Sequence, residues 1–254
     1  MNILGKTGII SGGASGLGEA TALLLHEKGA NVVIADANEE KGRTLADKLG
    51  QRALFVKTNI AVEGDVKHLC QETLKTFGTI DLLFNGAGIG GPGRIISKNG
   101  IYDLIKFKNI IDVNLIGTFS MICNAAWEMS KNVPEDGERG VIINVASVAA
   151  FEGQIGQCAY SASKGGIVSM TLPIARDLSQ YGIRVCTIAP GIFDTPMLGK
   201  LPGDVRASLN RQVPFPPRMG KPVEVAKLAL AIIENQYLNG EIIRIDGAIR
   251  MGPK

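Results

Sequence analysis

Three side chains in the middle of the chain, Ser147, Tyr160 and Lys164, could together move a proton. The four-residue spacing of Tyr160 and Lys164 places both on one face of the helix that we predict within residues 160–178. An ammonium beside a phenol favours the phenolate and lowers the phenol pKa from its usual ~10, so the tyrosine could exchange a proton near neutral pH. Ser147 could donate a hydrogen bond to the same substrate oxygen. Taken alone, the three residues also fit an ordinary helical pair and a turn serine.

A glycine-rich turn near the start of the chain could seat a phosphate. An apolar run over 7–11 leads into glycines at 12, 13, 16 and 18, and we predict a helix over 19–28. A strand, a glycine turn and a helix in this order place a pyrophosphate at the helix N-terminus. The spacing differs from GxGxxG, and glycine spacing alone is a weak signal. The residues of this turn that we expect at a cofactor are Gly12, Ser15, Gly16, Leu17 and Gly18.

A carboxylate follows the second predicted strand, 31–35, and indicates which dinucleotide would bind. Asp36 lies 20 residues beyond Gly16, the separation at which an acid accepts bonds from the adenosine ribose of NAD. The same charge would repel the 2′-phosphate of NADP, and neither Ala37 nor the glycine turn offers a base. A helix cap for the next segment is the alternative role of Asp36. The sequence therefore predicts NAD rather than NADP.

These candidates must be positioned by an α/β sheet. Apolar runs predict further strands at 53–56, 81–84, 141–145, 184–189 and 242–245, and helices are predicted at 40–49, 63–77, 115–129 and 223–235. Strands that alternate with helices predict a single doubly wound domain over 1–254, with about seven parallel strands and helices on both faces. Asp36, Asn59, Asn85 and Ser147 each follow a predicted strand, and such strand ends bind ligands.

Composition argues against several other classes of protein. The 254 residues are 45% hydrophobic and 20% charged with a net charge of +3, which is ordinary for a globular domain and gives no support for nucleic-acid binding. We find no leader-like start and no long apolar span, so we expect no membrane association. The cysteines are not spaced as metal ligands, so we expect no metal and four reduced thiols; they are Cys70, Cys123, Cys158 and Cys186.

Taken jointly, the motifs resemble the short-chain dehydrogenase/reductase family over the whole chain. The matching segments are the glycine turn, 85–88, 112–117, the set formed by Ser147, Tyr160 and Lys164, and 190–191. Two positions depart from the family pattern, since Ser11 stands where threonine is usual and Gly86 where a second asparagine is usual. Ser11 keeps a hydroxyl, whereas Gly86 removes a side chain.

The resemblance implies roles for further residues. Asn114 would complete the catalytic set by holding a water relay behind Lys164. Asn59 stands where an aspartate often contacts adenine, and Lys164 would also bond the nicotinamide ribose. The residues that the resemblance adds to the cofactor site are Asn59, Ile60, Gly86, Tyr160, Lys164, Phe193 and Thr195.

Segments 139–144, 149–154 and 239–251 resemble family members that oxidise 3-hydroxyacyl-CoA or hydroxysteroids. The resemblance implies NAD-dependent oxidation of a secondary alcohol to a ketone, with a short or branched 3-hydroxyacyl-CoA as the expected substrate and a steroid as the alternative. Gln154 lies between Ser147 and Tyr160, and its amide could bond the thioester carbonyl. We expect the proline-rich segment 197–221 to cover the substrate as a lid. Candidate cations for the CoA phosphates are Lys98, Lys106, Lys200, Arg206 and Arg211.

The resemblance also implies a homotetramer, a role in fatty acid or isoleucine degradation, and a place in the cytoplasm, or in the mitochondrial matrix of a eukaryote. The helix over 115–129 and the helix after Tyr160 carry more apolar residues than one sheet face needs, which is typical of an interface. Two well-buried helices are the alternative. A non-catalytic nucleotide-binding scaffold remains the other functional class, although all four catalytic positions are retained.

Overall fold

A seven-stranded sheet organises the molecule, in a computed structural model that describes residues 1–98, 100–196 and 203–253. The strand order is β3-β2-β1-β4-β7-β8-β9, and every neighbouring pair is parallel. The strands are β1 (Thr7–Ser11), β2 (Asn31–Asp36), β3 (Ala53–Lys57), β4 (Leu82–Asn85), β7 (Gly140–Val145), β8 (Ile183–Pro190) and β9 (Ile242–Ile245). The predicted fold class is therefore confirmed.

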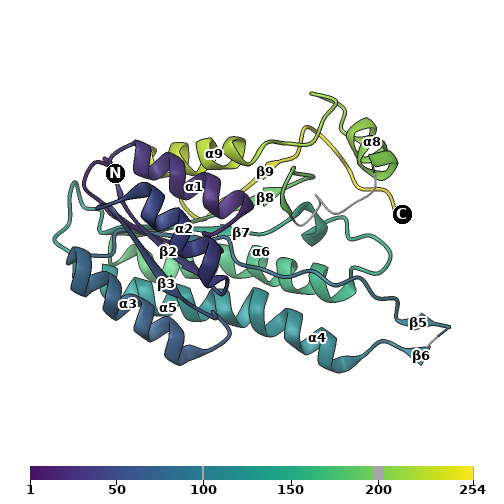
Figure 1. Cartoon of the computed structure of the whole chain (residues 1–254), viewed down its shortest axis with the longest axis horizontal. Helices are drawn as coiled ribbons and strands as arrows, with labels where there is room; N and C mark the ends of the chain where they lie inside the picture. The colour runs from purple at the N-terminus through teal and green to yellow at the C-terminus, as the bar shows by residue number, and fades with distance from the viewer. Residues whose placement is uncertain (99, 197–202, 254) are drawn as a thin grey trace.

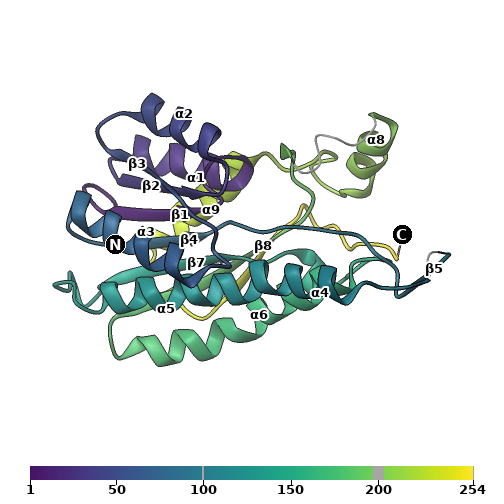
Figure 2. The ribbon, with the colours of Figure 1, turned by 60° about the horizontal axis from the view of Figure 1, so that its bottom comes forward.

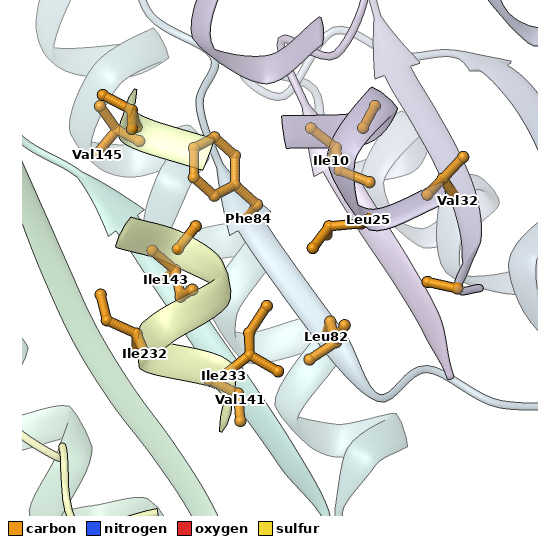
Figure 3. Close-up of a cluster of buried hydrophobic side chains, with 14 of the residues drawn as sticks. Ile10, Leu25, Val32, Leu82, Phe84, Val141, Ile143, Val145, Ile232 and Ile233 are labelled. Carbon is orange, nitrogen blue, oxygen red and sulfur yellow. The ribbon is translucent and has the colours of Figure 1, made fainter. Parts of the chain in front are cut away.

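Helices cover both faces of the sheet (Figures 1 and 2). One layer contains α1 (Gly16–Glu27), α2 (Glu39–Leu49) and α9 (Pro222–Glu234), whose apolar residues join one buried cluster. The other contains α3 (Glu63–Phe77), α5 (Thr118–Met129) and α6 (Cys158–Ser179), which join a second cluster. Figure 3 shows the first cluster, in which Ile10, Phe84 and Ile143 from three adjacent strands meet side chains of α1 and α9.

Alternation along the strands explains why two clusters form. Successive strand side chains point to opposite faces, so Ile10 joins the first cluster while its neighbour Ile9 joins the second. Phe84 and Leu83 divide in the same way. Strands buried on both faces must be apolar throughout, and this continuous apolar character made them predictable from sequence.

Several elements of the described part of the chain were not predicted. An antiparallel hairpin pairs β5 (Ile96–Ser97) with β6 (Gly100–Ile101), and α4 (Leu104–Ile111) follows it. A π-helical turn, η1 (Asp112–Gly117), then joins α4 to α5. α8 (Gly203–Gln212) lies beyond segment 197–202 of the expected lid, which falls outside the described residues. Figures 1 and 2 place α8, the hairpin and the C-terminus at the same end of the molecule.

The run of helix from Leu104 to Met129 is long and apolar enough to span a membrane by length and composition, contrary to the expectation that the chain has no such span. About half of its most apolar window is buried inside the fold, 44% in all. Its α5 part packs against α3, β4 and β7. This packing is typical of the core helix of an α/β domain.

Candidate active site

The structure places Ser147 after β7 and both Tyr160 and Lys164 on α6. Ser147 follows β7 and begins a short 3-10 turn, η2 (Val148–Ala150), where its Oγ accepts a bond from the N–H of Ala149 at 3.1 Å. The Ser147 side chain is also hydrogen-bonded to that of Tyr160. Tyr160 and Lys164 lie one turn apart on α6, with the lysine Nζ 5.8 Å from the centre of the tyrosine ring. The three groups can therefore surround one substrate oxygen.

Burial dominates the protonation of this set. It raises the pKa of Tyr160, and the bond with Ser147 only partly opposes that shift. It also lowers the pKa of Lys164 to about 8. The expectation that Lys164 lowers the pKa of Tyr160 is thus not met, because the loss of hydration on burial raises the pKa of the phenol. The Lys164 ammonium is held by the carbonyl of Val145, to which its Nζ donates at 2.7 Å.

Asn114 lies in η1 and is fully buried. Its Oδ1 accepts from the N–H of Ile89 at 2.8 Å, and its Nδ2 donates to the Ile89 carbonyl at 2.9 Å. The same Nδ2 donates to Ser163 Oγ at 3.0 Å, and Ser163 donates to the Tyr160 carbonyl at 2.7 Å. Asn114 therefore ties the loop after β4 to the turn that carries Tyr160. A water relay through Asn114 stays a prediction.

Ser163 is a residue that sequence reasoning missed. It bonds both to Asn114 and to the turn of Tyr160, and it is fully buried. Its position immediately before Lys164 places it on the same helix, but a serine inside a helix has no pattern that distinguishes a buried link from an exposed hydroxyl. Only the packing of η1 against α6 reveals its role.

The glycine turn forms a cradle that only glycine can build. Gly12 has a φ of +65°, and a Cβ there would lie 2.8 Å from the Cα of Ala87. A Cβ on Gly18 would overlap the carbonyl of Gly12. Ser15 is the N-cap of α1 and makes no capping bond with its side chain, so the first turn keeps N–H groups for an anion. The half-buried side chain of Leu17 packs against the first core cluster.

Asp36 stands at the end of β2 beside this cradle. Its carboxylate accepts bonds from the N–H of Ala14 at 3.0 Å and of Asn38 at 2.9 Å. Ser11 Oγ accepts from the N–H of Ala87 at 3.3 Å, so the serine hydroxyl links the glycine turn to the loop after β4. The second departure from the family pattern is steric, since a Cβ on Gly86 would lie 2.9 Å from the Ser11 carbonyl.

The remaining cofactor candidates lie around the same sheet edge. Asn59 is exposed after β3, and its Oδ1 accepts from the N–H of Ala61 at 3.1 Å, while Ile60 is buried. The side chain of Phe193 is buried in the core, so any contact with a nicotinamide would come from its backbone. Thr195 reaches the cradle: its side chain lies 3.5 Å from a Cβ placed on Gly16. These residues, together with the fit of the glycine cradle to a pyrophosphate, suit a dinucleotide.

The loop between Ser147 and Tyr160 is held on two sides. The N–H of Gly93 donates to the carbonyl of Gly156 at 2.8 Å, which joins the loop to the base of the β5–β6 hairpin. On the other side, Gln154 Nε2 donates to the Gly252 carbonyl at 3.2 Å. The loop residue Ala149 is buried, whereas Phe151 is half exposed. Gln154 therefore lies on a loop fixed by distant segments, and its contact with a substrate stays a prediction.

Three of the candidate cations lie in described elements next to this loop or to α8. Lys98 and Lys106 are exposed on the hairpin and α4, and Arg211 is exposed on α8. Lys200 and the side chain of Arg206 lie outside the described residues. Among the residues that the structure describes, no group of three or more His, Cys, Asp or Glu side chains could hold a metal ion.

Comparisons with known proteins agree with this geometry. A family model described as short chain dehydrogenase matches residues 6–205. A relative from Bos taurus named 3-hydroxyacyl-CoA dehydrogenase type-2 is 53% identical, over 99% of this chain and 98% of its own. The crystal structure of a protein of the same name from Mycobacterium avium superposes with a TM-score of 0.94 at 43% identity, covering 98% of both chains. A 3-ketoacyl-(acyl-carrier-protein) reductase from Brucella melitensis, complexed with NADH, gives a TM-score of 0.88 at 30% identity, over 98% of this chain and 100% of its own.

Proposed function

The chain belongs to the short-chain dehydrogenase family, and we propose that it oxidises a short or branched 3-hydroxyacyl-CoA to the 3-ketoacyl-CoA with NAD. The observation that carries the proposal is the contact between Ser147 and Tyr160, one helical turn from a buried Lys164, beside a glycine cradle. The name carried by the Bos taurus and Mycobacterium avium relatives supports the substrate class.

Tyr160 is the acid and base of the proposed reaction. In the oxidative direction its phenolate takes the proton of the substrate hydroxyl, and in the reductive direction the phenol returns it. Ser147 holds the same oxygen by a hydrogen bond. Lys164 contributes positive charge beside the phenol when it is protonated, and Asn114 fixes the loop after β4 against α6. Bound beside these residues, NAD would supply the acceptor for the hydride that leaves the carbinol carbon.

Residues of the sheet edge hold the cofactor in this proposal. The first turn of α1 would receive the pyrophosphate, and Gly12 and Gly18 allow the turn before it to pack closely against Ala87 and against itself. Asp36 accepts bonds from the adenosine ribose and excludes the phosphate of NADP. The other proposed contacts are Ser15, Leu17, Asn59, Ile60, Gly86, Tyr160, Lys164, Phe193 and Thr195.

The substrate loop and the lid select the acyl group. The buried Ala149 and half-exposed Phe151 offer apolar surface to a short chain, and the Gln154 amide bonds the thioester carbonyl. We propose segment 197–221 as the lid; α8 and the half-buried Leu209 belong to its described part. Lys98, Lys106 and Arg211 meet the CoA phosphates at the mouth. A hydroxysteroid is the second candidate, because the same apolar surface suits it without any cation.

The deciding experiment compares kcat/KM for acetoacetyl-CoA, free acetoacetate and a 17-keto steroid, at low and high salt. We expect the CoA ester to lead, and its advantage to shrink at high salt because the phosphate contacts are screened. If the free acid equals the ester, or the steroid exceeds it, the acyl-CoA assignment fails. No change in NADH absorbance with any ketone would favour a non-catalytic scaffold instead.

We also propose a homotetramer in a reducing compartment, the cytoplasm or a mitochondrial matrix, serving fatty acid or isoleucine breakdown. The exposed apolar side chains of η1, α5 and α6 support the assembly; they are Ile116, Phe119, Trp127 and Leu172. All four cysteines are free, and burial raises the pKa of the Cys70 thiol to about 12, which keeps it protonated. Free thiols suit a reducing environment.

A further inference from the structure

A group of four charged side chains, Glu152, Arg244, Asp246 and Arg250, lies between the substrate loop and the end of β9 (hereafter the clamp). Arg244 grips Glu152 with two bonds, from Nη1 to Oε1 at 2.7 Å and from Nη2 to Oε2 at 3.1 Å. Its Nε donates to Asp246 Oδ2 at 2.7 Å, and Arg250 lies 3.3 Å from Glu152 and 3.2 Å from Asp246. Such a two-pronged contact between arginine and carboxylate is stronger and more directional than a single bond.

The clamp fastens segment 249–253 to the loop. Glu152 Oε2 accepts from the N–H of Met251 at 3.1 Å, and Arg244 Nη2 donates to the Ile249 carbonyl at 3.1 Å. The N–H of Ile155 donates to the Pro253 carbonyl at 3.0 Å. Figures 1 and 2 show the C-terminal segment running from β9 to the end of the molecule that carries α8 and the hairpin. Residues almost a hundred positions apart are thus joined at the mouth of the site.

The fastened segment in turn holds Gln154, whose Nε2 donates to the Gly252 carbonyl. That bond uses one hydrogen of the amide, so the other hydrogen and the carbonyl oxygen can still serve a ligand. Ser147 and Tyr160 do not depend on the clamp in this way, because η2 and α6 position them. Losing the clamp should therefore disturb substrate contacts before it disturbs proton transfer.

We infer that Glu152 and Arg244 are positioning residues that act through segment 249–253 on Gln154, and so set substrate affinity. The inference rests on the dehydrogenase function proposed above. The side chains of Arg244 and Glu152 are only about one-fifth exposed, 22% and 21%, so water competes with their contact less than at an open surface pair. The bond to Arg244 lowers the pKa of Glu152, which keeps the carboxylate charged at neutral pH.

The test is a double-mutant cycle with acetoacetyl-CoA and NADH. Glu152→Gln should raise KM about tenfold, with kcat within about threefold of the wild type, since the change weakens ground-state binding. Gln154→Ala should raise KM by a similar factor. The double variant should be no worse than Gln154→Ala, because coupled residues are not additive. Arg244→Lys keeps the positive charge but cannot make the two-bond contact with the carboxylate, so it should raise KM as Glu152→Gln does.

The matched control is Glu39→Gln on α2, which also removes a carboxylate with two basic partners, Arg43 and Lys57, and should leave KM unchanged. Hydrogen exchange gives a readout apart from activity: the Met251 and Ile155 amides should exchange faster in Glu152→Gln, with NADH affinity unchanged. Additive effects on KM, a loss of kcat and NADH affinity together, or unchanged exchange at Met251 would overturn the inference. If the wild type and Glu39→Gln both fail to reduce acetoacetyl-CoA, the proposed function fails, and the exchange experiment still decides the clamp.

Discussion

At the residue scale, burial sets the chemistry of the Ser147, Tyr160 and Lys164 site. The spacing of Tyr160 and Lys164 was readable from the sequence, because a helix repeats every 3.6 residues. The direction of the tyrosine pKa was not, because it depends on how much water the folded site admits. The helix that carries both residues also carries Ser163, which bonds to Asn114. The sequence can therefore predict which residues form such a catalytic set. The pKa values of these residues can be judged only once the packing around them is known.

Tyr160→Phe is expected to lose about 100- to 10,000-fold in kcat, because only the hydroxyl can carry the proton at this position. NADH binding should persist, since the ring and α6 remain. Steady-state kinetics and a fluorescence titration with NADH measure the two effects. Tyr181→Phe, a tyrosine beyond the end of α6, is the control and should behave as the wild type. Near-normal turnover in Tyr160→Phe would end the proposed mechanism.

Lys164→Met should change how stability depends on pH. The folded pKa of Lys164, about 8, lies below its ordinary value of 10.5, so between these values the unfolded chain holds more protons and stability rises with pH. The wild type should therefore gain about 2 kcal/mol in free energy of unfolding, relative to the variant, between about pH 7 and about pH 9.5. Urea unfolding at both pH values measures this. Lys227→Met, at an exposed lysine, is the control. If the free energy of unfolding of Lys164→Met changed with pH in the same way as that of the wild type, burial would not lower the pKa of Lys164.

At the scale of elements, the parts with strong periodic patterns were predictable and the short ones were not. The seven strands are continuous apolar runs, and each was found within a few residues of its bounds. The strands β5 and β6 have two residues each, with Ile96 and Ile101 more than 70% exposed, so no burial pattern marks them. The π-helical turn at Asn114 depends on one extra residue per turn, which hydrophobic spacing does not reveal. Glu152 and Arg244 lie 92 residues apart, and no local pattern pairs them.

The close packing of α1 against the glycine turn predicts the effect of a larger residue at Gly18. Gly18→Ala should lower the free energy of unfolding by about 1–3 kcal/mol, because the new methyl meets the backbone of Gly12 and the helix must shift. NADH binding should weaken with it, since the shifted helix N-terminus no longer fits the pyrophosphate. Urea unfolding and an NADH titration measure both. Gly64→Ala on α3 has open space around the new methyl and is the control. Equal stability of the two variants would contradict the close packing of α1.

At the scale of the whole molecule, one end gathers the functional parts. The glycine cradle, the substrate loop, the hairpin, α8 and the C-terminal segment come from widely separated parts of the sequence. Parallel strands explain the gathering, since all seven end at the same edge of the sheet. The sheet edge was therefore predictable, but the contacts made by the hairpin and by segment 249–253 arise from the three-dimensional path of the chain.

The helices on the α3, α5 and α6 face of the sheet leave apolar side chains exposed to solvent. Phe119 is 49% exposed and Trp127 66% exposed on α5, and Leu172 is 43% exposed on α6. Exposed apolar patches of this kind usually lie in interfaces, and symmetric assemblies pair such patches with themselves. The double variant Phe119→Asp and Trp127→Asp should therefore dissociate the proposed tetramer, because it would bury unpaired charge.

Light scattering after size-exclusion chromatography measures this, with the wild type expected at about four times the mass of one chain. Tyr237→Asp is the control, since Tyr237 is 100% exposed on the loop after α9 and should leave the assembly intact. A wild type that is monomeric at micromolar concentration would refute the tetramer. If the double variant is still a tetramer, the interface does not include this face of α5. If dissociation also raises KM without changing NADH affinity, the assembly supports the substrate site as well as the stability of the fold.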